Sequence, residues 1–341
     1  MPETRSYTRV TIVDVAARAG VSTATVSRVI NRTAPVAPET ESLVQSAIAE
    51  LNYRPHAAAQ VLASRKTNTL GLLLPEIGGD FFSLMLRGVE AGARESGFAL
   101  LIYSTRGVNT SNARGRCPLG EHNTDGLLVF PDSLPDAELM RLHQMGFPVV
   151  LLHRSPPPDL DIPGVTVENK TGARKAVDHL IKVHGCRRIA FLSGPEGHED
   201  SYWREMGYRE ALAAHDISFD PTLVAMGGFD DRVGQDAVNQ MLMEGLEFDA
   251  IFAGDDEAAV GALTALNRSG VRVPQDVALV GFDDTFLSRY LTPPLTTVRA
   301  PIEQVGQEAV RQLVGLIRRG RADALVLLPT ELVIRHSCGC D

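Results

Sequence analysis

Residues 11–31 read TIVDVAARAGVSTATVSRVIN, and this stretch predicts two short helices on either side of a tight turn. Thr11 and Asp14, three positions apart, form a capping-box pattern at the start of the first helix. Gly20 ends that helix, and Ser22 can cap the second. The outer side of the second helix carries small, polar or cationic residues, namely Thr23, Ala24, Ser27, Arg28 and Asn31. A short helix of this kind fits the major groove of DNA, although an amphipathic helical hairpin without a DNA role has the same periodicity.

The next segment predicts a third helix followed by a short connection. The helix is expected over residues 38–51, with Pro38 at its first position and with Ala37 unable to cap it. Residues 53–66 are Ala-rich and are either a linker or a hinge helix that folds only when it is paired with a second copy on DNA. In the second case Leu62 is an apolar wedge for a minor-groove base step, or it packs in the dimer core.

From residue 70 onward, short apolar runs alternate with amphipathic segments, which predicts parallel α/β sheets. Strands are expected at 70–75, 99–104, 126–130, 149–153, 165–167, 188–194, 222–227, 250–254, 277–282 and 332–336. Helices are expected at 81–96, 136–145, 171–184, 203–214, 232–243, 256–269 and 301–319. The number of strands favours two lobes, with ligands beyond the carboxyl ends of the strands. Residues 106–123 lack an apolar stripe and are expected to form a loop or a short distorted helix.

Charge is unevenly distributed along the 341-residue chain, whose formal net charge is −9. Residues 1–66 hold eight Lys and Arg against five acids, a net of +3, so the remainder carries −12. A basic head on an acidic body indicates that only the head contacts a polyanion. The N-terminus lacks an apolar segment of signal-peptide type, and no apolar run reaches the ~20 residues of a membrane span. A cytoplasmic location and no membrane partner are therefore expected.

The sequence predicts no enzyme, cofactor or metal site. It contains no G-x-S-x-G elbow, no phosphate-binding G-x-x-x-x-G-K-[ST] loop and no H-E-x-x-H motif. The four cysteines, at positions 117, 186, 338 and 340, are expected to be free thiols. Cys338 and Cys340 could bind a soft metal, but the pair offers only two of the four ligands that zinc prefers.

Several separated motifs, in order and at matching spacing, resemble the LacI/GalR (lactose-repressor/galactose-repressor) family of transcriptional regulators. The motifs are DVAARAGVSTATVSRVIN (14–31), LNYRPHAAAQVLAS (51–64), PEIGGDFF (75–82) and VPQDVALVGFDDTFLSRYLTPPLTTV (273–298). The resemblance covers essentially the whole chain. It implies an α/β protein in which an all-α helix-turn-helix head precedes a two-lobed core of parallel sheets, like that of periplasmic binding proteins.

The same resemblance implies how the chain is divided. The head would cover residues 1–55, a hinge helix or linker 56–66, and an effector-binding and dimerisation core 67–341. The first lobe would comprise about 67–166 and 297–328, and the second about 167–296 and 329–341. Crossovers between the lobes would fall near 165–168, 292–298 and 328–331. The implied assembly is a homodimer, usually a repressor, on a pseudo-palindromic double-stranded DNA operator.

Matching positions in the head imply which residues touch DNA. Thr23, Ala24 and Arg28 match the base-reading side, and Arg28 is the candidate for a guanine contact. The alternative for Arg28 is a solvated surface charge. Leu62 matches the hinge wedge. Residues that match phosphate contacts are Thr11, Ser22, Thr25, Ser27 and Asn31.

Matching positions in the core imply an effector site. Phe81 and Phe82 match residues that line the cleft, with helix-start core packing as the alternative. Arg204 matches an arginine that hydrogen-bonds the ligand, and Phe229 an aromatic ring that stacks on it. Asp255 and Asp283 follow strands at their carboxyl ends and can accept bonds from ligand hydroxyls.

Helix capping is the alternative for the two aspartates, although the adjacent Asp256 and Asp284 are the better cap candidates. His153 stands where relatives often have Asp, and Glu168-Asn169 replaces their common Asp-Asn pair. Together these groups favour a sugar or sugar derivative over a purine as the effector. The alternatives left open are a sugar-binding receptor without a DNA role and a nucleobase-responsive, co-repressed regulator. Whether the effector induces or co-represses is not implied.

Overall fold

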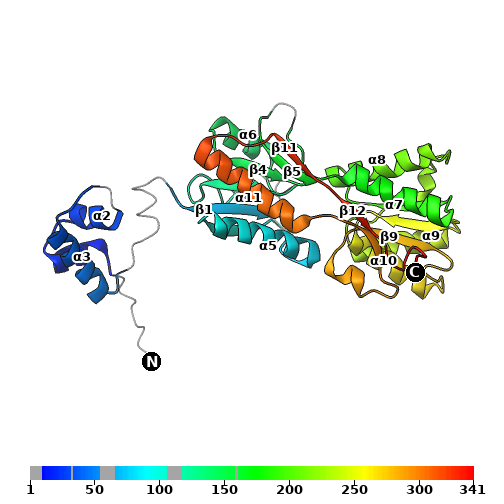
Figure 1. Ribbon diagram of the computed structural model, residues 1–341, viewed down its shortest axis with the longest axis horizontal. Coiled ribbons are helices and arrows are strands. Elements are labelled where there is room, and N and C mark those ends of the chain that lie inside the picture. The colour runs from blue at the N-terminus through cyan, green and yellow to red at the C-terminus, as the bar shows by residue number, and fades with distance from the viewer. Residues whose placement is uncertain (1–9, 32–33, 54–65, 106–116, 158–159) are drawn as a thin grey trace, which may run out of the picture. The chain divides into compact units, whose positions relative to one another are not determined.

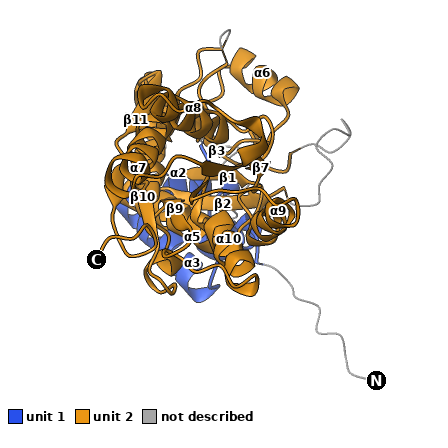
Figure 2. Cartoon of the chain, turned by 90° about the vertical axis from the view of Figure 1, so that its right-hand side faces the viewer, with its two compact units in different colours: residues 1–67 blue, residues 68–341 orange. Residues whose placement is uncertain are grey.

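The computed structural model describes residues 10–31, 34–53, 66–105, 117–157 and 160–341. The chain divides into two compact units, residues 1–67 and 68–341, which Figure 2 shows in different colours. Leu62 and most of the expected hinge lie outside the described residues. Of the expected loop at 106–123, only 117–123 are described, and they form bends and turns without a helix.

The described residues of the first unit form three helices: α1 (Ile12–Ala19), α2 (Thr23–Asn31) and α3 (Pro38–Glu50). Their small core contains Val15, Ala16, Val26, Val44 and Ala47. As predicted, Gly20 ends α1 in the left-handed conformation, with a φ of 69°. The helix-turn-helix arrangement of the opening motif is therefore confirmed.

The second unit contains two six-stranded sheets with helices on their faces (Figure 1). The first sheet has the order β11-β5-β4-β3-β1-β2. Its strands are β1 (Thr69–Leu74), β2 (Ala99–Ser104), β3 (Gly126–Val129), β4 (Val149–Leu152), β5 (Gly164–Val167) and β11 (Leu325–Leu328). Its helices are α5 (Gly79–Glu95), α6 (Asp136–Gln144) and α11 (Ile302–Arg319). All its strand pairs are parallel.

The second sheet has the order β12-β10-β9-β8-β6-β7. Its strands are β6 (Ile189–Ser193), β7 (Val224–Met226), β8 (Ala250–Ala253), β9 (Ala278–Asp283), β10 (Thr296–Arg299) and β12 (Glu331–Val333). Its helices are α7 (Asn169–His184), α8 (Glu199–Ala214), α9 (Asp231–Met243) and α10 (Asp256–Arg268), with short 3-10 turns at Pro221–Leu223 and Phe286–Arg289. Only β12 runs antiparallel, against β10. The prediction of two parallel α/β lobes is confirmed.

Two strands, β10 and β11, were not predicted: β10 overlaps the crossover expected near 292–298, and β11 ends where the crossover near 328–331 was expected to begin. β10 begins with Thr296 and Thr297, which are polar yet completely buried. Their hydroxyls have partners inside the fold, since the Thr297 Oγ1 donates to Asp256 at 2.6 Å. β10 belongs to the second sheet, so the second crossing follows Arg299 and lies beyond the expected 292–298. The first and third crossings follow β5 and β11.

Close helix packing positions α8, which carries several residues considered below. A Cβ atom on Gly207 would lie 2.3 Å from the backbone oxygen of Lys170 in α7. Only glycine allows the two helices to approach this closely. Tyr208 beside it is buried, and its hydroxyl donates to the Ile189 carbonyl at 2.8 Å. Among the described helices, none has the length and apolar character needed to cross a membrane.

Candidate functional site

The outer face of α2 is available for an interaction. Ser22, Thr23, Ala24 and Arg28 are exposed, and Thr25, Ser27 and Asn31 are half-buried, whereas Val26 on the opposite side is completely buried. Arg28 makes no ion pair with another described residue of the head. A basic side chain on an exposed short helix can reach phosphates or base edges in a major groove.

Capping bonds fix the starts of the first two helices. Thr11 donates its backbone N–H and its hydroxyl to the Asp14 carboxylate, both at 2.7 Å, and these bonds lower the pKa of Asp14. Ser22 accepts from the backbone N–H of Thr25 at 3.1 Å, and its Oγ lies 2.9 Å from the Thr25 hydroxyl. These bonds orient the end of α2 that the sequence assigns to DNA.

A cavity of about 260 Å³ lies at the carboxyl ends of the strands of the second unit, with walls from both halves. The half of the first sheet supplies aromatic rings, and the half of the second sheet supplies most of the charged groups. The lining residues are Pro75, Glu76, Phe81, Phe82, Phe130, Pro131, Asp132, Pro195, His198, Asp200, Arg204, Gly228, Phe229, Asp255, Glu257 and Asp283. An apolar cleft with a few convergent polar groups is the usual form of a small-molecule site.

Arg204 is the largest charged group in this cavity, and it is almost completely buried at 2% exposure. Its Nε donates to Asn169 at 2.8 Å, and one terminal nitrogen donates to the Gly254 carbonyl at 2.5 Å. The other terminal nitrogen donates to Asp283 at 3.2 Å. A guanidinium has five N–H donors, so these three bonds leave two for a ligand. The Arg204 Cζ atom also lies 3.8 Å from the ring centroid of Phe282, which limits its movement.

Three aromatic rings form the opposite wall. The centroids of Phe81 and Phe82 are 5.3 Å apart, and those of Phe82 and Phe130 are 5.4 Å apart, all with edge-to-face geometry. Phe229 faces them from the second half, with its ring centroid 5.3 Å from the Cζ of Arg204. The cavity therefore offers flat apolar surfaces beside hydrogen-bonding groups, an arrangement that suits the C–H faces and the hydroxyls of a sugar ring.

His153 lies behind the lining instead of in it. Its side chain is completely buried, and its ring centroid is 5.2 Å from Phe81 and 5.5 Å from Phe130. Its Nδ1 lies 2.7 Å from the Oδ2 of Asp200, which does line the cavity. In this structure His153 is thus separated from the cavity by the residues in front of it, whereas the sequence predicts that it lines the effector site.

Asp200 joins both halves of the unit. Besides His153, it accepts from Asn169 Nδ2 at 2.7 Å and from the Thr166 hydroxyl at 3.3 Å. Although burial opposes ionisation, His153 and Arg204 hold the pKa of Asp200 well below its usual range. Asp200 is therefore an anion that positions Arg204 and Asn169.

Three other acids of the cavity, Asp255, Glu257 and Asp283, have raised pKa values. Burial and the charge of Asp283 raise the pKa of Asp255 well above its usual range, and burial raises that of Asp283 itself. Burial and the charge of Glu76 raise the pKa of Glu257 to about 7. Carboxyl oxygens accept bonds from hydroxyls and the N–H groups of Arg204 donate to them, so this wall can match hydroxyl groups, which do both.

Three of the sequence-predicted residues have an unusual backbone. His153, Phe229 and Asp283 have φ values of 49°, 56° and 107°, in the left-handed region that favours glycine. Each lies close to the carboxyl end of a strand. Such conformations persist where the surrounding structure imposes them, often at binding sites.

Six of the seven predicted effector residues come together in the cavity: Phe81, Phe82, Arg204, Phe229, Asp255 and Asp283. Asp255 is also the N-cap of α10, because its carboxylate accepts from the Ala258 N–H at 2.9 Å. The expectation that Asp256 would be the better cap is wrong, since its carboxylate bonds Thr285 and Thr297 instead. Asp255 therefore has both the structural and the lining role.

Sequence reasoning missed Phe130, His198, Asp200 and Glu257, all of which line the cavity. The sequence predicts a helix from 203, whereas α8 begins at Glu199, so Asp200 lies in the first turn of a helix and not in the loop before it. Glu199-Asp200 at the start of an amphipathic segment is an acidic first-turn pattern that could have located it. Burial lowers the pKa of His198, which keeps this cavity residue neutral.

Comparisons with known proteins agree with these features. Residues 11–56 match the model of bacterial regulatory proteins of the lacI family, and residues 177–338 match that of a periplasmic binding protein-like domain. The chain is 36% identical to the HTH-type transcriptional regulator CelR of Thermobifida fusca, over 96% of this chain and 98% of that protein. It is 35% identical to GalR of Escherichia coli K12, over 96% and 95% of the two chains.

Solved structures show the same fold. A CelR–cellobiose complex, 35% identical, superimposes with a TM-score of 0.72 and covers 96% of this chain and all of that one. A lac repressor dimer bound to its operator and an anti-inducer, 28% identical, superimposes with a TM-score of 0.81 over 97% and 99% of the two chains. These regulators are not enzymes. The chain belongs to the lacI family of bacterial regulatory proteins and is a helix-turn-helix, DNA-binding transcriptional regulator under small-molecule control.

Proposed function

We propose that the effector is a neutral sugar or sugar derivative that binds in the cavity lined by Arg204, Asp255 and Asp283. The observation that carries this proposal is the pairing of an aromatic wall with a wall that holds the Arg204 donors and the carboxyl groups of Asp255 and Asp283. A sugar presents an apolar ring face and several hydroxyls, which match these walls. The cellobiose complex of a relative supports the same class of ligand.

The proposed target is a pseudo-palindromic operator bound by a homodimer. The operator-bound dimer of the lac repressor supports this assembly. Arg28, Thr23 and Ala24 would face base edges, and the residues that would hold phosphates are Thr11, Ser22, Thr25, Ser27 and Asn31. Two copies of the head on one duplex require half-sites related by two-fold symmetry.

Control of DNA binding would come from bonds that link the two halves of the second unit. Ser155 beyond β4 donates its backbone N–H to Glu199 of α8 at 2.7 Å, and Leu287 N–H donates to Asp80 of α5 at 3.3 Å. A ligand that binds one arrangement of the halves more tightly shifts the population toward that arrangement. The lobes of this proposal keep the expected boundaries near 67–166, 167–296 and 329–341, except that the second crossing follows Arg299, so that the first lobe resumes after 299 instead of at 297.

Calorimetry of the full chain tests the effector. The panel comprises cellobiose, galactose, ribose and, as the competing class, free nucleobases and nucleosides. We expect a sugar to bind with one site per chain, and Arg204→Lys to weaken binding because lysine lacks the planar fork of donors. Arg209→Lys, on the exposed side of the same helix, is the matched control. Binding of a nucleobase without any sugar response would contradict the proposal.

A gel-shift assay on selected operators, with and without the sugar that binds, tests the allosteric step. We expect the sugar to change operator affinity by a factor that Arg204→Lys reduces and Arg209→Lys does not. Equal operator affinity with and without a bound sugar would show that the cavity does not control the head.

A further inference from the structure

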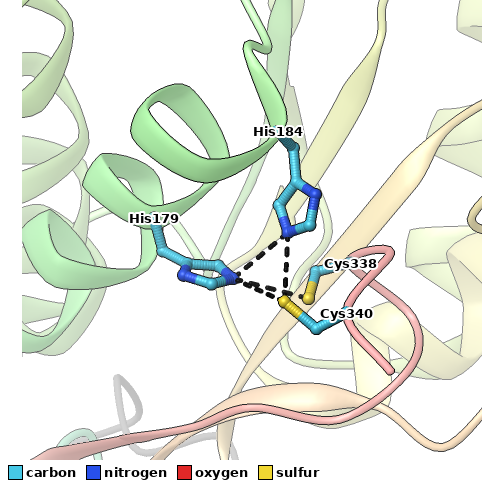
Figure 3. Close-up of side chains that lie close together, drawn as sticks. All are labelled: His179, His184, Cys338 and Cys340. Carbon is cyan, nitrogen blue, oxygen red and sulfur yellow. Dashed lines mark hydrogen bonds between the residues drawn. The ribbon is translucent and has the colours of Figure 1, made fainter.

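Four potential metal ligands meet at the C-terminal end of α7, outside the head and outside the cavity. His179 and His184 come from α7, and Cys338 and Cys340 come from the turn that follows β12 (Figure 3). One ligand atom of each residue can be chosen so that all four lie within 4.8 Å of one another. Figure 3 shows both rings and both sulfur atoms directed toward a common point.

Four of the six distances between these atoms match the edges of a tetrahedron. The two Nε2 atoms are 3.3 Å apart, and His184 Nε2 lies 3.4 Å from Cys340 Sγ. His179 Nε2 lies 3.5 Å from Cys338 Sγ and 3.6 Å from Cys340 Sγ. Tetrahedral zinc, with Zn–N of about 2.0–2.1 Å and Zn–S of about 2.3 Å, requires N···N of about 3.3 Å and N···S of about 3.5–3.6 Å.

The local backbone brings the turn against the helix. Gly339 between the two cysteines has a φ of 103°, which a residue with a side chain rarely adopts. A Cβ atom on Gly339 would lie 3.3 Å from His184 Nδ1, so the absence of a side chain also makes room for the ring. Gly185 ends α7 in the left-handed conformation directly after His184. The Cys-Gly-Cys sequence is therefore suited to placing two sulfur atoms beside two imidazoles.

Bonds that involve no ligand hold the turn in place. Ser337 is buried, donates its hydroxyl to the Leu279 carbonyl at 2.6 Å and accepts from the Thr296 N–H at 2.8 Å. The Thr296 hydroxyl also donates to Cys338 Sγ at 3.2 Å. A hydroxyl that bonds a ligand sulfur is a common outer-shell partner of a metal site. The four groups are thus preorganised by the second sheet.

Charge also favours a cation at this position. The site adjoins the C-terminal end of α7, where the helix dipole is negative. Two thiolates would neutralise a divalent ion, and two neutral imidazoles would complete its coordination. Hydrogen bonds between pairs of these side chains would not require all four ligand atoms to point at one position, whereas a bound metal ion does.

We propose that His179, His184, Cys338 and Cys340 bind Zn²⁺ in a closed structural site that fastens the C-terminal turn to α7. Two sulfur and two nitrogen donors in tetrahedral arrangement select zinc among the common divalent ions. Four protein ligands leave no open position, so the ion is structural and not catalytic. The site is independent of the effector cavity and of the proposed sugar.

Cobalt titration of the reduced, metal-free full chain tests the site. We expect one Co²⁺ per chain, with thiolate-to-cobalt charge-transfer absorption and the visible bands of a tetrahedral ion, and displacement by one Zn²⁺. His184→Gln and Cys340→Ser each remove one ligand, while circular dichroism verifies the fold. We expect each to weaken binding by more than about 100-fold, because loss of outer-shell partners alone costs about 10–100-fold.

Two variants provide matched controls. Cys117→Ser removes a free thiol from the other half of the unit, and His336→Gln removes an exposed histidine from the same C-terminal turn. Both should bind cobalt as the unmodified chain does. Cobalt without charge-transfer absorption, unchanged affinity in Cys340→Ser and His184→Gln, or a Cys338–Cys340 disulfide in reducing buffer would each overturn the proposal.

Discussion

The Nδ1 atom of His153 lies 2.7 Å from the Oδ2 atom of Asp200, and both side chains are buried. His153 follows β4 of the first sheet, whereas Asp200 lies in the first turn of α8, beside the second sheet. The pair therefore joins the two halves of the effector-binding unit directly behind its cavity. A second His–Asp pair, His215 with Asp178 at 2.9 Å, is more exposed and lies within the second half alone.

The buried pair should stabilise the unit more than the exposed one. A double-mutant cycle with His153→Gln and Asp200→Asn should give a coupling of about 1–3 kcal/mol in urea unfolding, since the pair shares a buried network. The same cycle on His215 and Asp178 should give about 1 kcal/mol or less. Because the pKa of Asp200 is lowered, its contribution should be present above its usual range and disappear only in stronger acid. Equal couplings for the two pairs would contradict this assignment.

Asp256 should make the stability of the fold fall as pH rises. Its buried carboxyl bonds Thr297 at 2.6 Å and the Thr285 N–H at 2.8 Å, and burial raises its pKa to about 8. Between its unfolded pKa of about 4 and this value, the folded state holds a proton that the unfolded state releases. The contribution of Asp256 to stability is thus fully present below its pKa in the unfolded state. It is lost as the pH rises to its pKa in the folded state.

Asp256→Asn, which imitates the protonated acid, should flatten the dependence between pH 5 and 8. Urea unfolding of the full chain at several pH values, followed by circular dichroism, measures it. Asp276→Asn is the control, because the exposed Asp276 pairs with Arg272 and has a lowered pKa of about 2. If the free energy of unfolding of the Asp256 variant still fell with pH over this range, the pH dependence would come from other acids.

Gly194 should control where the Phe229 ring lies. A Cβ atom on Gly194 would be 2.3 Å from the Phe229 Cζ atom, so the ring must move in Gly194→Ala. If Phe229 stacks on the effector, affinity should fall about tenfold, consistent with about 0.5–1.5 kcal/mol for an aromatic contact. Calorimetry measures it, and Gly120→Ala, whose added atom would meet only ordinary contacts, is the control. Unchanged affinity in the Gly194 variant would remove Phe229 from the site.

Arg28 should read a base, whereas Arg18 should not. Arg28 is on the exposed side of α2, and Arg18 of α1 pairs with Glu50 at 2.5 Å. Arg28→Ala should weaken operator binding by about 1–3 kcal/mol and relax selectivity at one base pair. Arg18→Ala removes the same charge and should weaken binding to all sequences alike. Binding to operators with each base substituted in turn separates the two, and loss of selectivity in neither variant would exclude base reading by Arg28.

Local patterns predicted the helix-turn-helix and most strands because each carries its own signal in consecutive residues. Gly20 and Ser22 punctuate the head, and apolar runs such as 70–75 mark buried strands. Thr296 and Thr297 gave no such signal, because their hydroxyls bond residues that are distant in sequence: Thr297 bonds Asp256 at 2.6 Å, and Thr296 bonds Cys338 at 3.2 Å. The cavity residues at strand ends were predicted from the family resemblance. Asp200 could be predicted only if the start of α8 were known to lie at Glu199.

Groups that are distant in sequence were the hardest to combine. From the sequence, Cys338 and Cys340 offer only two of the four ligands that zinc prefers, and the two histidines of α7 that lie beside them come more than 150 residues earlier. His153 was assigned to the lining from its place after β4, although its left-handed backbone directs it into contact with Asp200. The periodicity of a single sequence does not predict contacts between residues that are so far apart along the chain.

The path of the chain between its two sheets has a consequence for biosynthesis. β11 is an edge strand of the first sheet, and α11 packs against β3, β4 and β5, yet both follow the whole of β6 to β10. A ribosome therefore releases almost the entire second half before the first half can be completed. During translation, one edge of β5 stays unpaired until residues 325–328 have been synthesised. A nascent chain that stalls before these residues exposes that strand edge, which can then pair with other chains and aggregate.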